Sequence, residues 1–252
     1  MDMKARARET ELGRQSILIV GMGGLGVPAA CALARGGVDR LGLVDPDPVE
    51  LSNLARQVIY GAASIGRLKV EAAAQRLRQK HPGLNVETYP VALEASNAID
   101  LIARYDFVID ATDDPAAKFL INDICIELGR PFVYAGVLGL SGQAMTVIPG
   151  RTACLRCLFE EAPDPGEIAT CRQAGIIGPV AAVIGEIVAA EALRWLKGGM
   201  PELAGKILTY DGSASGRIRS LSVSARAGCG CGAAPRTEDA TALAPARNQS
   251  SN

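Results

Sequence analysis

The sequence has 252 residues, of which 48% are hydrophobic and 21% charged. A chain of this size can bury a full core as one large α/β domain, so two domains of equal size are not expected. Its net charge of −1 gives no general attraction to nucleic acid or to an anionic membrane, and we expect neither as a partner. The seven cysteines are odd in number and partly in close pairs, which favours reduced thiols or metal ligands and a cytoplasmic location.

Two apolar stretches resemble targeting or membrane segments. Residues 16–34 are uncharged and follow several arginines, as in a secretory signal, but Glu9 and Glu11 lie in the basic part and glycines interrupt the apolar part. Residues 174–193 are long enough to span a bilayer, but Glu186 and Glu191 would be costly in hydrocarbon. We therefore expect a buried helix that begins near Pro179, a favoured first-turn residue.

The first part of the chain alternates between strand-like and helix-like segments. The predicted strands are residues 16–20, 40–45, 85–91, 105–110 and 131–137. The predicted helices are residues 27–37, 65–81, 95–105 and 115–129. Nearly continuous apolar strands that alternate with helices indicate a parallel sheet covered on both faces. We predict a doubly wound, Rossmann-like α/β fold that binds a nucleotide at the carboxyl edge of its strands.

The second part of the chain has a different pattern. From about Ser141, strand-like segments at 143–149, 205–211 and 217–224 are not each separated by a helix, so the mostly parallel sheet is expected to continue with antiparallel strands. Residues 158–175 are rich in proline, glycine and acidic residues, which is typical of a long loop. We expect one domain over residues 1–232, with a nucleotide-binding half at 15–137, a second half at 138–232 and a disordered tail at 233–252.

A glycine turn follows the first predicted strand. Gly21, Gly23 and Gly26 form the pattern GxGxxG, which lets backbone amides approach a pyrophosphate at a helix N-terminus. Asp45, at the end of the second predicted strand, is the acid expected to bind a ribose. This part of the site fits NAD and ATP equally well.

The residues downstream favour ATP with magnesium. Asn53, Arg56 and Lys69 lie between the second strand and the next helix. NAD needs no further cations, whereas the pyrophosphate that leaves ATP has to be stabilised by groups such as a guanidinium and an ammonium. The fourth strand ends in three carboxylates, those of Asp110, Asp113 and Asp114. A carboxylate at that edge could hold a Mg²⁺ ion that bridges phosphate oxygens.

The chain resembles the HesA/MoeB/ThiF family, relatives of the ubiquitin-activating enzymes, in six segments: GMGGLG, LVDPDPVELSNLARQ, IGRLKVEAA, DATDD, CLRC and TCRQAGIIGPVAAVIGEIVAAEAL. The resemblance runs from about residue 16 to residue 232 and keeps the order and spacing of these segments. It implies an ATP-dependent adenylyltransferase that activates the C-terminal glycine of a small β-grasp sulfur-carrier protein ending in Gly-Gly, for molybdenum-cofactor, thiamine or a related thiolation pathway. It also implies a homodimer.

The resemblance assigns roles to individual residues. The glycine turn would hold the nucleotide, Asp45 would bind the ribose, and Asp113 would position magnesium. The remaining nucleotide ligands, which would hold the phosphates, are Asn53, Arg56 and Lys69. No general base is needed, because the carrier's carboxylate is already ionised at neutral pH.

Two pairs of cysteines have the spacing of metal ligands. They are Cys154 with Cys157 and Cys229 with Cys231. Four thiolates from two distant pairs suit a closed tetrahedral structural zinc site. Family members that carry zinc have two residues between the cysteines of each pair, so the second pair here is one residue short, although Gly230 can take the dihedral angles that chelation would need. The alternative is four reduced thiols without metal.

Cys171 is a further catalytic candidate in the predicted loop. Its thiolate, favoured by the neighbouring Arg172, could attack the acyl-adenylate or exchange with a persulfide sulfur donor. A residue without a role in catalysis is the alternative. Cys31 and Cys125 fall on apolar faces of predicted helices and are expected in the core.

The sequence departs from the family pattern in two places. The acidic motif usually reads Thr-Asp-Asn, whereas Asp114 supplies a second carboxylate here. Family members also usually carry an N-terminal arginine that reaches into the partner's ATP site, and Arg14 lies too close to the first strand to fill its place. A non-catalytic carrier-binding module is therefore one alternative. The other, an NAD-dependent oxidoreductase, is disfavoured because no histidine, tyrosine and lysine set for hydride chemistry is present.

Overall fold

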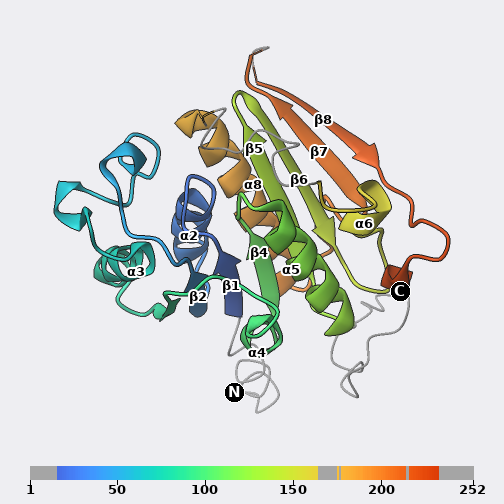
Figure 1. Ribbon diagram of the computed structural model, residues 1–252, viewed down its shortest axis with the longest axis horizontal. Helices are drawn as coiled ribbons and strands as arrows, with labels where there is room; N and C mark the ends of the chain where they lie inside the picture. The colour runs from blue at the N-terminus through green and yellow to red at the C-terminus, as the bar shows by residue number, and fades with distance from the viewer. Residues whose placement is uncertain (1–15, 164–174, 176, 214–215, 233–252) are drawn as a thin grey trace, which may run out of the picture.

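The computed structural model describes residues 16–163, 175, 177–213 and 216–232 (Figure 1). Cys171, Arg14 and the tail at 233–252 lie outside the described residues. The elements in chain order are β1 (Ser16–Val20), α2 (Gly26–Arg35), β2 (Arg40–Val44), α3 (Lys69–Lys80), β3 (Asn85–Tyr89), α4 (Ala98–Ile102), β4 (Phe107–Asp110), α5 (Pro115–Glu127), β5 (Phe132–Leu138), β6 (Ser141–Val147), α6 (Leu155–Leu158), α8 (Gly178–Leu196), β7 (Lys206–Asp211) and β8 (Arg217–Ser222), with 3₁₀ turns η1 (Leu51–Asn53), η2 (Ala62–Ser64) and η3 (Gly230–Gly232).

The strands form one eight-stranded sheet in the order β3-β2-β1-β4-β5-β6-β7-β8. The pairs from β3 across to β5 are parallel, whereas β5-β6, β6-β7 and β7-β8 are antiparallel pairs. The predicted α/β fold with an antiparallel continuation is confirmed. After β3 the chain returns to the opposite side of β1, so the strand order reverses between β1 and β4. In doubly wound folds, ligands bind in the crevice outside the strand ends at this switch point.

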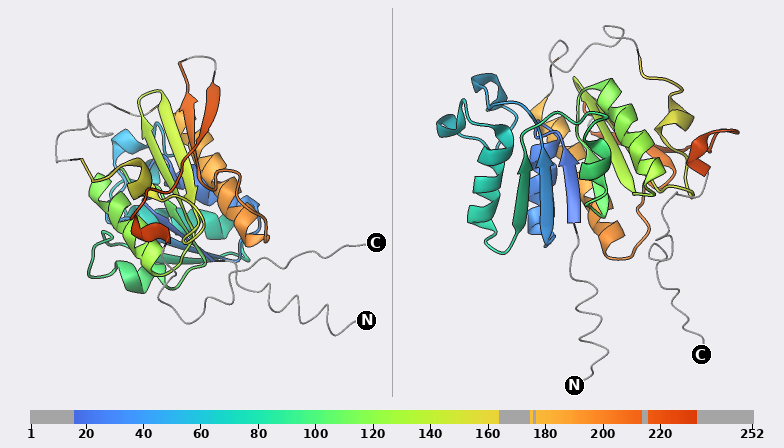
Figure 2. Two further views of the ribbon diagram at one scale, coloured as in Figure 1. Left: turned by 90° about the vertical axis from the view of Figure 1, so that its right-hand side faces the viewer. Right: turned by 60° about the horizontal axis from the view of Figure 1, so that its bottom comes forward.

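Helices cover both faces of the sheet because successive side chains of each buried strand point to opposite sides. Ile17 and Ile19 of β1 belong to a core cluster with side chains of α2, α3 and α8, whereas Leu18 and Val20 belong to a second cluster with α4 and α5. Figure 1 shows α5 in front of the sheet and α8 behind it, and Figure 2 shows the same layers from two other sides.

The predicted buried helix at 174–193 corresponds to α8, with Pro179 in its first turn. Glu191 on this helix is only 4% exposed. Its carboxylate accepts hydrogen bonds from the Thr146 hydroxyl at 2.7 Å and from the backbone N–H groups of Glu202 and Leu203 at 2.9 and 2.7 Å. This buried charge therefore ties α8 to β6 and to the segment before β7. Among the described residues no helix is long and apolar enough to cross a membrane.

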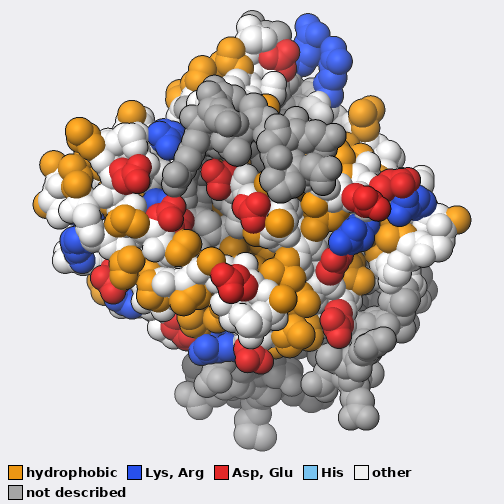
Figure 3. Space-filling view, in the orientation of Figure 1, with side chains coloured by type: hydrophobic (Ala, Val, Ile, Leu, Met, Phe, Trp, Pro, Cys, Tyr) orange, Lys and Arg blue, Asp and Glu red, His pale blue; other side chains and the backbone are white. Residues whose placement is uncertain are grey.

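The two cysteines expected in the core differ. Cys125 on α5 is fully buried, and burial raises the pKa of its thiol well above the usual value. Cys31 on α2 is only partly buried against the core. On the face seen in Figure 3, basic side chains are scattered singly or in small groups among acidic and hydrophobic ones, as the near-zero net charge leads one to expect.

Candidate functional site

The glycine turn between β1 and α2 packs tightly against the end of β4. Gly21 has a φ of 97°, and a Cβ atom there would lie 2.6 Å from the backbone oxygen of Ala111. A Cβ atom at Gly26 would overlap the backbone oxygen of Gly21. Only glycine fits at these two positions, so the turn packs directly against the backbone that follows β4. Gly23 has more space, because the nearest neighbour of a Cβ atom there would be 3.8 Å away.

Asp45, at the end of the second strand, lies directly beside this turn. Its carboxylate accepts hydrogen bonds from the backbone N–H of Met22 at 2.7 Å and of Asp47 at 2.9 Å. The Tyr60 hydroxyl donates to the Met22 carbonyl oxygen at 3.0 Å and holds the turn from the other side. Burial raises the pKa of Tyr60 far above its usual range, so this hydroxyl stays a donor. The acid predicted for a ribose is thus next to the glycines.

Lys69 begins α3 and is the most buried cation of the site, with a relative exposure of 7%. Its ammonium lies 2.8 Å from Asp47 and 3.4 Å from Asp45. The Lys69 backbone N–H donates to the Asp47 carbonyl oxygen at 3.0 Å, which fixes the start of the helix on this loop. A buried ammonium needs paired anions, and these two carboxylates supply them.

Asn53 and Arg56 lie on the segment that follows Asp47. The Asn53 side-chain oxygen accepts from the Glu50 backbone N–H at 3.0 Å, as part of a reciprocal cap of η1. The Arg56 guanidinium donates to the Ser52 carbonyl oxygen at 2.9 Å. Arg56 lies between Gly24 of the glycine turn and Gly178 at the start of α8, since Cβ atoms built there would contact it. Its side chain therefore reaches the turn.

Gln57 was not predicted from the sequence. It is 3% exposed, and its side-chain oxygen has no hydrogen-bond partner in the part of the chain that the structure describes. The side-chain nitrogen is the atom nearest to a Cβ built on Gly23. Its spacing from Asn53 is one helical turn, and the Gln57 backbone N–H donates to the Asn53 carbonyl oxygen at 2.9 Å. That spacing was the available signal that both residues face one side.

The three carboxylates after β4 have three different environments. Asp110 is completely buried and paired with Lys118, whose ammonium lies 3.2 Å from both carboxylate oxygens. Asp114 caps α5 by accepting from the backbone N–H groups of Ala116 and Ala117 at 3.3 and 3.0 Å. Asp113 is exposed, and no hydrogen bond or ion pair involves its side chain among the described residues. Of these three carboxylates, only that of Asp113 has no partner in the part of the chain that the structure describes.

The four predicted metal ligands come together. The sulfur atoms of Cys154, Cys157, Cys229 and Cys231 all lie within 4.8 Å of one another. Burial raises the pKa of Cys154 to about 11. Burial also raises the pKa of Cys157, but hydrogen bonds outweigh burial and lower this pKa to about 7, the largest lowering coming from the Arg226 backbone N–H that donates to the sulfur at 3.3 Å. The single residue between Cys229 and Cys231 is accommodated by the short turn η3.

Side chains of α5 support the cysteine segment. The Asn122 side-chain oxygen accepts from the Leu155 backbone N–H at 2.9 Å and is almost fully buried. Arg156 makes two hydrogen bonds to the Asp123 carboxylate, at 2.7 and 2.8 Å, and lies 5.0 Å from the centre of the Phe119 ring. The cysteine cluster and the turn that carries Asp113 and Asp114 are therefore attached to the same helix, α5.

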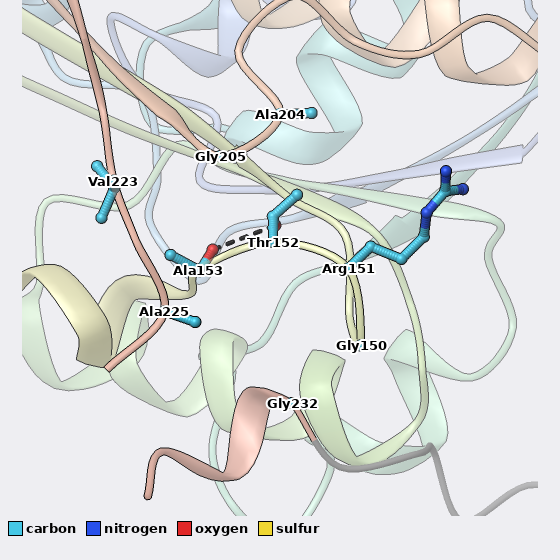
Figure 4. Close-up of a pocket in the computed structure, with 9 residues that line it drawn as sticks. All are labelled: Gly150, Arg151, Thr152, Ala153, Ala204, Gly205, Val223, Ala225 and Gly232. Atoms are coloured by element: carbon cyan, nitrogen blue, oxygen red, sulfur yellow. Dashed lines mark hydrogen bonds between the residues drawn. The ribbon is translucent and has the colours of Figure 1, made fainter. Parts of the chain in front are cut away.

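A cavity of about 320 Å³ lies beside the cysteine cluster. Glycine and alanine make up most of its lining, and in Figure 4 the Arg151 side chain points away from it. None of the residues predicted for catalysis or nucleotide binding lines it. This cavity is separate from the glycine turn.

The arrangement defines an α/β protein with a tight glycine turn at the switch point of its sheet, two cations beside that turn, and a carboxylate after β4 that has no partner among the described residues. A model of the ThiF family matches residues 3–233. The chain belongs to the ThiF family. Like the relatives that it matches, it is an adenylyltransferase.

Two relatives illustrate the similarity. The "Sulfur carrier protein adenylyltransferase" of Thermus thermophilus is 41% identical over 208 residues, which cover 81% of this chain and 77% of that protein. The "Adenylyltransferase and sulfurtransferase MOCS3" of Sus scrofa is 42% identical over 203 residues, which cover 81% of this chain but 45% of that protein. The chain thus spans less than half the length of this second relative.

Solved structures agree with the fold. The crystal structure of E. coli MccB with MccA-N7isoASN superposes with a TM-score of 0.78 at 21% identity and covers 89% of this chain and 69% of that one. The structure of E. coli MccB with ATP gives a TM-score of 0.76 at 20% identity, with 89% of this chain and 68% of that one covered. At this identity the likeness concerns the fold alone.

Proposed function

We propose that this chain transfers AMP from ATP to the C-terminal glycine carboxylate of a small ubiquitin-like sulfur-carrier protein, of the molybdopterin-synthase or thiamine type. The observation that carries the proposal is the set of residues packed around the glycine turn. Arg56 lies beside Gly24 of the turn, and Lys69 pairs with Asp45, which accepts from a backbone N–H of the turn. Gly21 packs on Ala111, two residues before Asp113. The name of the 41% identical Thermus thermophilus relative supports a sulfur carrier as substrate.

In the proposed reaction the glycine turn binds the nucleotide through backbone N–H groups and the N-terminus of α2. Asp45 binds the ribose hydroxyls, a role supported by its place beside Met22. The carrier's carboxylate attacks the α-phosphorus of ATP, the bond from that phosphorus to the bridging oxygen breaks, and pyrophosphate leaves with the electron pair. Because the attacking carboxylate is already ionised, no protein base removes a proton from it.

The cations of the site stabilise the departing pyrophosphate in this proposal. Lys69 is paired with Asp45 and Asp47, so the protein itself holds its ammonium in place. Arg56 is anchored through the Ser52 carbonyl oxygen and can turn one of its other donors to a phosphate. The Asn53 amide nitrogen makes a long hydrogen bond to the Ser52 hydroxyl, at 3.4 Å, and is the remaining proposed phosphate ligand.

The residues present fit a magnesium ion. Asp113 offers a carboxylate without a protein partner among the described residues, and carboxylate oxygens are the ligands that Mg²⁺ prefers. Mg²⁺ would supply charge neutralisation for the phosphate oxygens when it is bound. Asp110 and Asp114 are occupied by Lys118 and by the helix cap, so the proposal rests on Asp113 alone.

Zinc is the metal that we propose for the cysteine cluster. Four sulfur donors within 4.8 Å of one another match the ligand type and number of a closed structural zinc site. We assign residues 1–232 to one adenylation domain, with nucleotide binding at 15–137 and carrier and zinc binding at 138–232. A homodimer, a sulfur donor, a reaction at Cys171 and a cytoplasmic location remain predictions.

The test is ATP–pyrophosphate exchange with magnesium, with and without a panel of small carrier proteins that end in Gly-Gly. Exchange that depends on one carrier identifies the partner and supports the reaction. Binding of Mg-ATP without exchange for any carrier would contradict the carrier assignment and favour another carboxylate substrate or a non-catalytic module. Protection against thermal unfolding by NAD but not by Mg-ATP would contradict the nucleotide assignment.

A further inference from the structure

The ion pair of Asp110 and Lys118 lies directly behind the turn that carries Asp113. Asp110 ends β4 and is 0% exposed, while the Lys118 side chain is 13% exposed. The Lys118 ammonium also donates to the Ala135 carbonyl oxygen of β5 at 2.6 Å and lies 5.0 Å from the centre of the Tyr134 ring. One side chain therefore joins α5, β4 and β5 at the carboxyl edge of the sheet.

Stability alone is a weak reason for a pair of this kind. Taking two charges out of water costs as much as their attraction returns, and apolar replacements of buried ion pairs are often neutral or stabilising. Apolar side chains fill most of this core, and the pair is placed where the chain has to turn sharply from strand to helix. Its geometry is the more informative property.

Both neighbours of Asp113 are anchored, Thr112 by the ion pair and Asp114 by its own cap. The Asp110 carboxylate accepts from the backbone N–H of Thr112 at 3.1 Å and from its hydroxyl at 2.8 Å. On the other side, Asp114 is fixed as the cap of α5. Asp113 lies between these two anchored residues, and its own carboxylate is exposed. The direction in which that carboxylate points is set by the turn rather than by a bond of its own.

Charge adds a second effect. Three carboxylates occur within five residues, from Asp110 to Asp114, at the edge where a triphosphate would bind. Lys118 neutralises Asp110 from the protein side, so fewer uncompensated negative charges face the nucleotide.

We propose that Lys118, acting through Asp110, is a positioning residue that holds the Asp113 turn in the geometry needed by the metal–nucleotide complex. This inference rests on the proposed adenylation function. Lys118 does not touch the nucleotide in this proposal. Loss of the Lys118 side chain moves Asp113 and thereby weakens binding of the metal–nucleotide complex.

The variants Lys118→Met and Lys118→Arg test the proposal, with Glu191→Gln as a matched control. Glu191 is also a buried charged residue with several hydrogen bonds, but it lies on α8 and ties β6 to the segment before β7. All three are compared with wild type for melting temperature, for the Mg²⁺ concentration that gives half-maximal ATP–pyrophosphate exchange, and for binding of Mn²⁺-ATP followed by water-proton relaxation.

We expect Lys118→Met to raise the half-saturating Mg²⁺ concentration at least tenfold and to weaken Mn²⁺-ATP binding by a similar factor. Lys118→Arg keeps the positive charge and is expected to restore both values to within threefold of wild type. Glu191→Gln is expected to lower the melting temperature without changing the metal dependence. The double variant Asp110→Asn with Lys118→Met is expected to lose no more than Lys118→Met alone, because the two residues act as one unit.

The inference is overturned if Lys118→Met binds Mn²⁺-ATP as wild type does, or if the metal dependence of Glu191→Gln shifts as much as that of Lys118→Met. Mn²⁺-ATP binding needs no carrier protein, so it separates this inference from the carrier assignment. A wild-type protein that binds no Mn²⁺-ATP would overturn the proposed function, and this inference with it.

Discussion

The parallel and antiparallel halves of the sheet are held together by different means. Around β1, β2 and β4, buried aliphatic side chains pack on both faces, and ion pairs such as Arg40–Glu87 and Lys69–Asp45 lie at the periphery of this core. Beyond β6, four free cysteines lie close together, and Arg156 beside them pairs with Asp123 of α5. We therefore expect the parallel half to keep its shape without a metal, and the antiparallel half to depend on the proposed zinc.

The largest expected effect is the loss of activity in Asp113→Asn. The amide cannot supply the charge that the proposed Mg²⁺ site needs, so we expect exchange to fall by about 10²- to 10³-fold. The melting temperature should stay unchanged, because this side chain is exposed and has no partner in the described part of the chain. Exchange assays and thermal unfolding on the same preparation check both statements. Activity close to wild type would remove Asp113 from the site.

The next effect concerns the antiparallel half. Cys154→Ser removes one of four proposed zinc ligands. Loss of a residue that only hydrogen-bonds to a metal ligand costs about 10- to 100-fold in metal affinity, so we expect a larger loss of zinc affinity here. Elemental analysis should find close to one zinc per wild-type chain and little in the variant. Wild-type protein purified without chelator and free of zinc would contradict the site. Proteolysis is expected to begin in residues 150–232 of the variant.

The smallest effect concerns the cap of α5 in the parallel half. Asp114→Ala removes the cap of α5 and should cost about 1 kcal/mol of stability, while Asp114→Asn, an equally good cap, should cost almost nothing. Neither variant should change the magnesium dependence by more than a few fold, in contrast to Asp113→Asn. Denaturant titration and the exchange assay measure the two quantities. A strong loss of magnesium response in Asp114→Asn would place the metal on Asp114 instead of Asp113.

Sequence patterns were sufficient for most of the parallel half. The run SILIV predicted β1 as observed, and the glycine spacing predicted the turn that follows it. Asp45 was expected beside the turn because strand ends in a doubly wound sheet share one edge. The antiparallel strands were also predicted, although β6 begins at Ser141 rather than at residue 143.

The different environments of Asp110, Asp113 and Asp114 could not be predicted from the sequence. All three are the same residue type in one short motif, and their environments differ because Lys118 reaches back from α5 to only one of them. In the same way, the partial exposure of Cys31 depends on how separate segments pack. Such long-range contacts leave no periodic signal in the sequence.

The helix α5 has a consequence for how the protein can be divided. Its first turn holds the acidic motif, and Asn122 and Asp123 near its middle hold the cysteine segment. A fragment cut after residue 137 would lose Leu155 and Arg156, which bond to these two side chains, and would expose the edge of β5 that pairs with β6. The two halves named from the sequence are therefore expected to be inseparable as fragments and to unfold together in one transition.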